Sequence, residues 1–133
     1  METIINNLVK DKISNDCSTF WFEGGILLSE YIVANVDLNV ARKGVELRHS
    51  IVQGRSYPLF VDISKVKSIN KEAREYLSQP EASMYIKAAA LLASSYLSKI
   101  AGTFFLSFNR PPIPTKLFTD KVEALKWLER FVD

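Results

Sequence analysis

Two apolar runs joined by a short glycine turn stand near the start of the chain. Residues 18–22 read Ser-Thr-Phe-Trp-Phe, Glu23-Gly24-Gly25 follows, and residues 26–32 are again mostly apolar. Aromatic and β-branched runs on both sides of such a turn are typical of a β-hairpin, because glycine adopts positive φ angles without strain. We therefore predict a hairpin over residues 18–32. Residues 1–17 either lie loose or extend its first strand.

The pattern then changes to helical spacing. Apolar residues recur three and four positions apart after Asp37, which can act as an N-cap, and Gly54 follows the end of this stretch. Gly44 lies inside the predicted helix at a cost of about 1 kcal/mol relative to alanine, which indicates close packing or weak helicity there. Tyr57-Pro58 stops the helix. The apolar run Leu59–Ile63 then suits a central strand that is buried on both faces.

The next segments predict a second helix and another central strand. Residues 64–69 form a short loop, and Asn70 is a good N-cap for a helix over Lys71–Leu77, which Pro80 ends or kinks. Periodicity alone leaves the run Ile86–Ala93 open between strand and helix. We interpret it as a strand because Ser94-Ser95 resembles the cap of a separate helix.

That separate helix carries an unusually aromatic stripe, and one more strand and helix follow it. The stripe consists of Tyr96, Leu97, Ile100, Ala101, Phe104, Phe105 and Phe108. The proline-rich residues 110–114 exclude regular structure, Lys116–Phe118 is a short last strand, and Asp120 begins a closing helix. Its apolar positions are Val122, Leu125, Leu128 and Phe131 or Val132.

This order of elements predicts the fold class. A hairpin followed by alternating helices and strands implies an α/β protein with a mixed sheet and about four helices. We expect the runs 59–63 and 86–93 to be interior strands. Four side chains should pack against that sheet: Ile100, Phe104, Leu125 and Leu128.

Composition narrows the classes of protein and of site. The chain has 133 residues, and 17 Lys and Arg against 15 Asp and Glu give a net charge of +2, so we expect no nucleic-acid partner. One cysteine and one histidine supply neither a disulfide framework nor a zinc site. No run resembles a signal peptide or a membrane span. We expect one cytoplasmic domain over residues 1–133, with no metal and no cofactor.

No catalytic constellation is visible in the sequence. Cys17 has no neighbouring base that would lower its pKa, and His49 is expected to be a partly exposed helix residue. Gly24-Gly25 is too short for a phosphate-binding loop. The sequence therefore predicts a protein that is not an enzyme.

Two segments resemble a known family. Residues 58–76 and 114–128 are similar to uncharacterised bacterial proteins related to the STAS domain, also described as STAS/SEC14-like or SpoIIAA-like, and the resemblance covers roughly residues 18 to 132. It implies a SpoIIAA-like fold. The regulatory STAS proteins carry an Asp-Ser-Ser-Gly loop in which a serine is phosphorylated. Matching by position places Asn70 on the Asp, Lys71 and Glu72 on the two serines, and Ala73 on the Gly.

The resemblance therefore implies an interaction module without the phosphorylation switch. Glu72 partly imitates the charge of a phosphate, or is simply a favourable acid in the first turn of a helix. The structural alternatives at this loop are a cap formed by Asp62 and a solvated basic face. The candidate binding residues lie around the same loop: Asp62, Lys65, Lys67, Asn70, Lys71 and Glu72.

Two functions remain open from the sequence. The first is a non-enzymatic regulatory or protein-interaction module, with a homodimer as one form of assembly. The second is a carrier or sensor of a small apolar or anionic ligand, for which the stripe 96–108 would wall a cavity and the basic loop would meet the anion. Core packing explains the stripe equally well.

Overall fold

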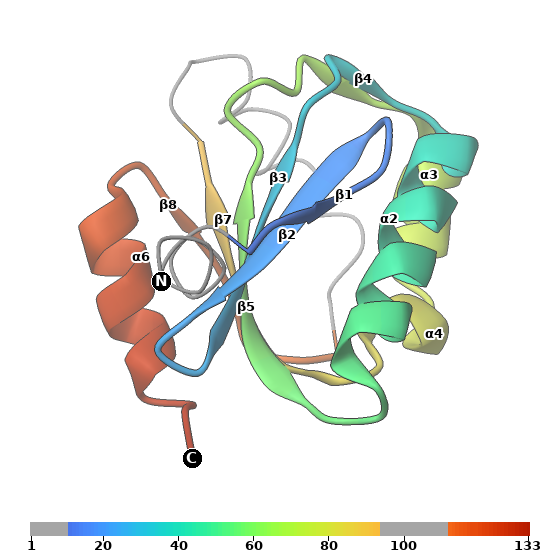
Figure 1. Cartoon of the computed structure of the whole chain (residues 1–133). Coiled ribbons are helices and arrows are strands. Elements are labelled where there is room, and N and C mark those ends of the chain that lie inside the picture. The colour runs from blue at the N-terminus through green and yellow to red at the C-terminus, as the bar shows by residue number, and fades with distance from the viewer. Residues whose placement is uncertain (1–10, 94–111) are drawn as a thin grey trace.

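The computed structural model describes residues 11–93 and 112–133, which contain a mixed sheet of six strands (Figure 1). The first three neighbouring strands are antiparallel and the rest run parallel. This confirms the predicted α/β class. The strands in order across the sheet are β1 (Ile13–Ser14), β2 (Ser18–Glu23), β3 (Ile26–Tyr31), β5 (Tyr57–Asp62), β7 (Ile86–Leu92) and β8 (Thr115–Phe118).

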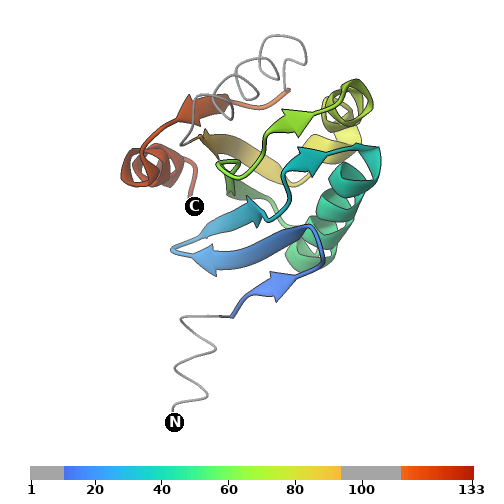
Figure 2. The same cartoon turned by 90° about the horizontal axis from the view of Figure 1, so that it is seen from above.

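The described helices lie on both faces of this sheet. Helix α6 covers one face, while α2, α3 and α4 cover the other (Figures 1 and 2). The α6 face is closed by residues such as Leu28, Phe60 and Leu128, all at most 1% exposed. The bounds of the helices are α2 (Leu38–Val52), α3 (Lys71–Leu77), α4 (Pro80–Ser83) and α6 (Lys121–Glu129).

The predicted hairpin is confirmed, and its turn requires glycine. Gly24 and Gly25 have φ angles of 55° and 82°, in the left-handed region. A Cβ atom on Gly25 would also lie 2.7 Å from a methyl carbon of Val132. The turn therefore packs against the C-terminal end of the chain at Gly25, where there is no room for a side chain, whereas Gly24 is favoured by its φ angle alone.

Helix α2 begins and ends as the sequence predicts. The side chain of Asp37 accepts a hydrogen bond from the amide of Val40 at 2.9 Å. Gly44 lies where the helix approaches the sheet, because a Cβ atom there would be 3.4 Å from Ser18 Oγ and 3.8 Å from the Tyr31 hydroxyl. These are ordinary contact distances, so the helix packs on β2 and β3 at Gly44, but the packing alone does not require a glycine there.

Two details of the predicted elements are wrong. The segment 64–69 is not only a loop, because Ser68–Ile69 forms strand β6, which pairs in parallel with β4 (Asn35–Val36) as a second small sheet. Val122 is 61% exposed, because it lies in the first turn of α6 and faces away from the sheet. By contrast, α3 ends at Leu77, ahead of Pro80, as predicted, and Pro80 occupies the first turn of α4, where its missing N–H costs nothing.

The other predicted elements have different outcomes. Residues 86–92 form a strand, as predicted, and β5 begins at Tyr57, with a register irregularity at Pro58. Leu128 is fully buried and Leu125 is partly buried against the sheet. The stripe 96–108, with Ile100 and Phe104, lies outside the described residues.

Candidate functional site

Asp62 lies at the end of β5 and caps the loop that follows. Its Oδ1 accepts a hydrogen bond from the amide of Ser64 at 2.8 Å. This is the ordinary role of an aspartate after a strand, since its carboxylate binds a nearby backbone amide. The structure therefore shows the capping role that the sequence left open for Asp62, and a binding role for this carboxylate stays a prediction.

The basic loop is held beside β4 by its backbone. The amides of Lys67 and Ser68 both donate to the carbonyl of Ala34, at 2.7 and 3.2 Å, and the side chains of Ser68 and Asn35 lie 2.7 Å apart. Lys65 and Lys67 are exposed. Pairing with β4 thus fixes the backbone of the loop while these ammonium groups face solvent.

The start of α3 is capped by the chain itself. Asn70 Oδ1 accepts from the amide of Ala73 at 2.9 Å, so this amide is not free for an external anion. Lys71 pairs with Glu75 at 3.9 Å one turn later, and Glu72 is exposed in the first turn. The helix has seven residues. We therefore assign no anion site to its N-terminus; the cap at Asn70 is as predicted, and a binding role for Asn70, Lys71 and Glu72 stays a prediction.

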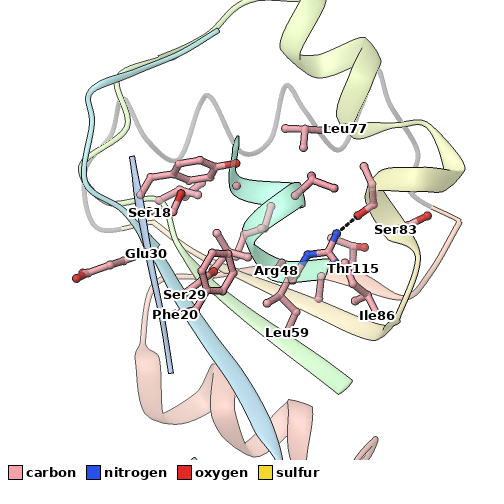
Figure 3. Close-up of a pocket in the computed structure, with 18 of the residues that line it drawn as sticks. Ser18, Phe20, Ser29, Glu30, Arg48, Leu59, Leu77, Ser83, Ile86 and Thr115 are labelled. Carbon is pink, nitrogen blue, oxygen red and sulfur yellow. Dashed lines mark hydrogen bonds between the residues drawn. The ribbon is translucent and has the colours of Figure 1, made fainter. Parts of the chain in front are cut away.

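A cavity of about 130 Å³ lies between the sheet and helices α2, α3 and α4 (Figure 3). Apolar side chains from the parallel strands and the helices form most of its wall, including Leu59, Val61, Leu77 and Leu91. Three residues with small side chains also border this space: Gly44 on α2, Ser29 on β3 and Ala89 on β7.

Arg48 is the charged residue buried at this cavity. It is 3% exposed, and two of its guanidinium N–H groups donate to backbone carbonyls, those of Met84 at 2.8 Å and of Ala82. No carboxylate pairs with it among residues 11–93 and 112–133. Burial lowers the pKa of Arg48 to about 10, so the side chain still carries its charge at neutral pH.

The sequence analysis missed Arg48, although a signal was present. An arginine between Leu47 and His49 is typical of a solvated helix position. Yet Ala41, Val45, Arg48 and Val52 follow one another at intervals of three and four, and all are buried. The helical stripe that faces the sheet therefore includes the arginine.

The polar groups around Arg48 offer it little compensation. Glu30 also borders the cavity, but its side chain points away from it (Figure 3). The hydroxyl of Ser29 donates to the carbonyl of Phe60 at 3.1 Å. Burial raises the pKa of Tyr31 to about 12, which keeps its hydroxyl neutral.

Cys17 and His49 lie in separate environments. The Cys17 thiol is buried and donates to Asp16 Oδ1 at 3.4 Å, and burial raises its pKa, which disfavours the reactive thiolate. The His49 ring packs edge to face on Tyr85, and its Nε2 is buried with no hydrogen-bond partner among the described residues. Within the described ranges, no group of three His, Cys, Asp or Glu residues could hold a metal ion, and no helix is long and apolar enough to cross a membrane.

Taken together, the sheet order and the helices on its two faces define an α/β protein with a SpoIIAA-like fold. A crystal structure described as an uncharacterized protein of the DUF3478 family with a SpoIIAA-like fold, from Shewanella loihica PV-4, matches with a TM-score of 0.61. It is 18% identical, and the alignment covers 87% of this chain and 98% of that one. The sequence-based recognition of a SpoIIAA-like, STAS-related chain is thereby confirmed at the level of the fold.

The family of the chain follows from its sequence. A family model described as "Domain of unknown function (DUF7793)" matches residues 20–132, so the chain belongs to that family. A protein of unknown function from Arthrobacter sp. FB24 is 24% identical over 90% of this chain and 98% of its own, with a TM-score of 0.34. No curated protein matches.

Proposed function

We propose that this chain is a non-enzymatic, cytoplasmic interaction module that binds an acidic surface of a protein partner through the basic loop, residues 64–72. The observation that carries the proposal is the exposure of Lys65, Lys67 and Lys71 on a backbone that is fixed by β4 and by the capped start of α3. A fixed backbone limits the entropy that is lost on binding. Exposed charges favour specificity and fast association.

Binding at this loop is constitutive in our proposal. Glu72 stands where the resemblance to the regulatory STAS proteins places a phosphorylated serine, so a negative charge is permanently present. Two observations support a non-enzymatic role. The Cys17 thiol bonds to Asp16, and the His49 ring packs on Tyr85, so neither supplies a nucleophile with its base.

Charge reversal tests this surface. The double variant Lys67→Glu and Lys71→Glu should weaken partner capture about tenfold or more in cross-linked purifications from cells that express the tagged chain. The matched control, Arg55→Glu with Lys126→Glu, changes the net charge equally at exposed positions outside the loop and should leave capture unchanged. Both variants should keep their free energy of unfolding within about 0.5 kcal/mol per substitution.

Two results would contradict the proposal. The first is equal capture by the loop variant and the control. The second is phosphate on Ser68 that controls capture, because the site would then be switched. Light scattering on the purified chain identifies the case in which the partner is a second copy of the same chain.

A further inference from the structure

We propose that the cavity between the sheet and α2 binds a small apolar monocarboxylate whose carboxylate pairs with Arg48. This site is separate from the basic loop and is independent of the function proposed for that loop. It also differs from the cavity expected from the stripe 96–108, since all residues that carry the argument lie in the described ranges.

The first step is the charge of Arg48. Buried charges are normally paired, because taking an ion out of water costs several kcal/mol that only a counter-ion and full hydrogen bonding offset. Only 3% of Arg48 is exposed. Among the described residues, its guanidinium group binds two backbone carbonyls and no carboxylate. An external anion would supply the missing negative charge.

The second step is the hydrogen-bonding capacity of the guanidinium. Two of its five N–H groups are used by the carbonyls of Ala82 and Met84, and the remaining ones have no acceptor among the described residues. Figure 3 shows the guanidinium among the side chains that border the cavity, near Ser83 and Thr115. Its planar fork matches a carboxylate.

The third step is the size and polarity of the ligand. The cavity holds about 130 Å³, close to the roughly 150 Å³ of an engineered apolar cavity that binds benzene. Its wall is mainly Leu, Val, Ile and Ala. A ligand body of about six carbon atoms fits this space.

The fourth step is the number of charges on the ligand. Arg48 is the only cation among the described residues that border the cavity. A phosphate monoester would bring close to two negative charges to one guanidinium and leave one of them uncompensated in an apolar wall. The site therefore favours a monoanion, and a carboxylate is the common planar one.

The test uses the full chain and defined probes. Hexanoate and benzoate are titrated into ¹⁵N-labelled protein and followed by NMR, with benzamide as an uncharged analogue and phenyl phosphate as a more highly charged one. We expect saturable shifts at Gly44, Arg48, Val61 and Ala89 with a carboxylate. Benzamide and phenyl phosphate should bind at least about tenfold more weakly than benzoate.

Two variants test separately whether carboxylate binding needs the charge of Arg48 and the open volume of the cavity. Arg48→Gln should abolish carboxylate binding, whereas Lys126→Gln removes the same charge from an exposed position on α6 and should leave it intact. Ala89→Leu fills the cavity and keeps Arg48, so it should also abolish binding. If Arg48→Gln fails to fold, the Ala89→Leu variant still tests whether the carboxylate binds in the cavity. Reversal of Lys67 and Lys71 should not alter binding, which keeps this test distinct from that of the loop.

Several outcomes would overturn the proposal. One is the absence of saturable shifts with any carboxylate at millimolar concentration. Others are equal affinity for benzoate and benzamide, tighter binding of phenyl phosphate, and binding that survives Ala89→Leu. The first leaves Arg48 as a purely structural clamp between α2 and α4. The second and third assign a different ligand, and the last places the ligand elsewhere.

Discussion

The two faces of the sheet are built from the same strands but differ in how completely they are filled. On the α6 face, Leu28, Phe60 and Ala88 meet Ala124 and Leu128 without exposure above 1%. On the α2 face, the next residues along the same strands, Ser29, Val61 and Ala89, border the cavity and Arg48.

This difference arises because successive residues of a strand point to opposite faces. Each strand can therefore place a large apolar residue on one side and a small one on the other. Buried apolar clusters lie on both faces, such as Leu28, Phe60 and Leu128 on the α6 face and Leu27, Val52 and Leu59 on the α2 face. The α2 face has space and a buried charge, which are costs to stability and are the features that a binding site needs. The comparison predicts that equal substitutions on neighbouring residues have unequal effects.

The largest expected difference concerns two leucines. Leu28→Ala on the closed face should lower the free energy of unfolding by about 4 kcal/mol, because it opens a void among rigid neighbours. Leu59→Ala should cost about 2.5 kcal/mol, because Leu59 already borders a cavity and has fewer contacts to lose. Urea unfolding measures both. A larger loss for Leu59→Ala would show that the α2 face is packed as closely as the α6 face.

A smaller and opposite effect is expected at two adjacent alanines of β7. Ala88→Val should cost about 1 to 3 kcal/mol, because the α6 face has no room for two more methyl groups. Ala89→Val should be neutral or stabilise the protein by about 1 kcal/mol, since the new methyls enter the cavity. Melting temperatures of the two variants decide between these signs. Destabilisation by both would mean that the space beside Ala89 is not open.

The smallest expected effect is a pH dependence of the free energy of unfolding, caused by His49 on α2. Burial, with the nearby charge of Arg48, lowers the pKa of His49 below its ordinary 6.5. The unfolded chain therefore binds a proton at higher pH than the folded chain, so the free energy of unfolding should fall as the pH drops below about 6.5. Urea unfolding at about pH 7.5 and pH 5.5 measures this change. His49→Gln should reduce it, and an unchanged pH dependence in that variant would assign it to another group.

Local sequence signals were sufficient for most of the described elements. The Gly24-Gly25 turn, the N-caps Asp37, Asn70 and Asp120, and the apolar run of β5 each depend on neighbours along the chain, and each was predicted correctly. The small sheet was missed for the converse reason. Ser68–Ile69 becomes a strand only because β4 lies beside it, and two residues carry no periodicity of their own.

The two candidate sites also differ in whether their residues are close together in the chain. The basic loop could be found from the sequence because its lysines are close together in the chain, although its backbone contact with Ala34 could not. The roles of Asp62 and Asn70 as caps were also among the predicted alternatives. The cavity could not be found, because its wall combines residues from β2, β3, α2, β5 and β7.

What the sequence determined by itself is the set of elements and their order, since turns, caps and hydrophobic periods are properties of short segments. From that order the α/β class follows, while the SpoIIAA-like fold was implied by the resemblance of residues 58–76 and 114–128 to STAS-related proteins. Only the tertiary structure decided which side chains meet across the sheet. Whether Arg48 lies in water or against a cavity depends on how α2 packs on the strands, and the space that remains is bordered by Gly44, Ser29 and Ala89, which are far apart in the chain.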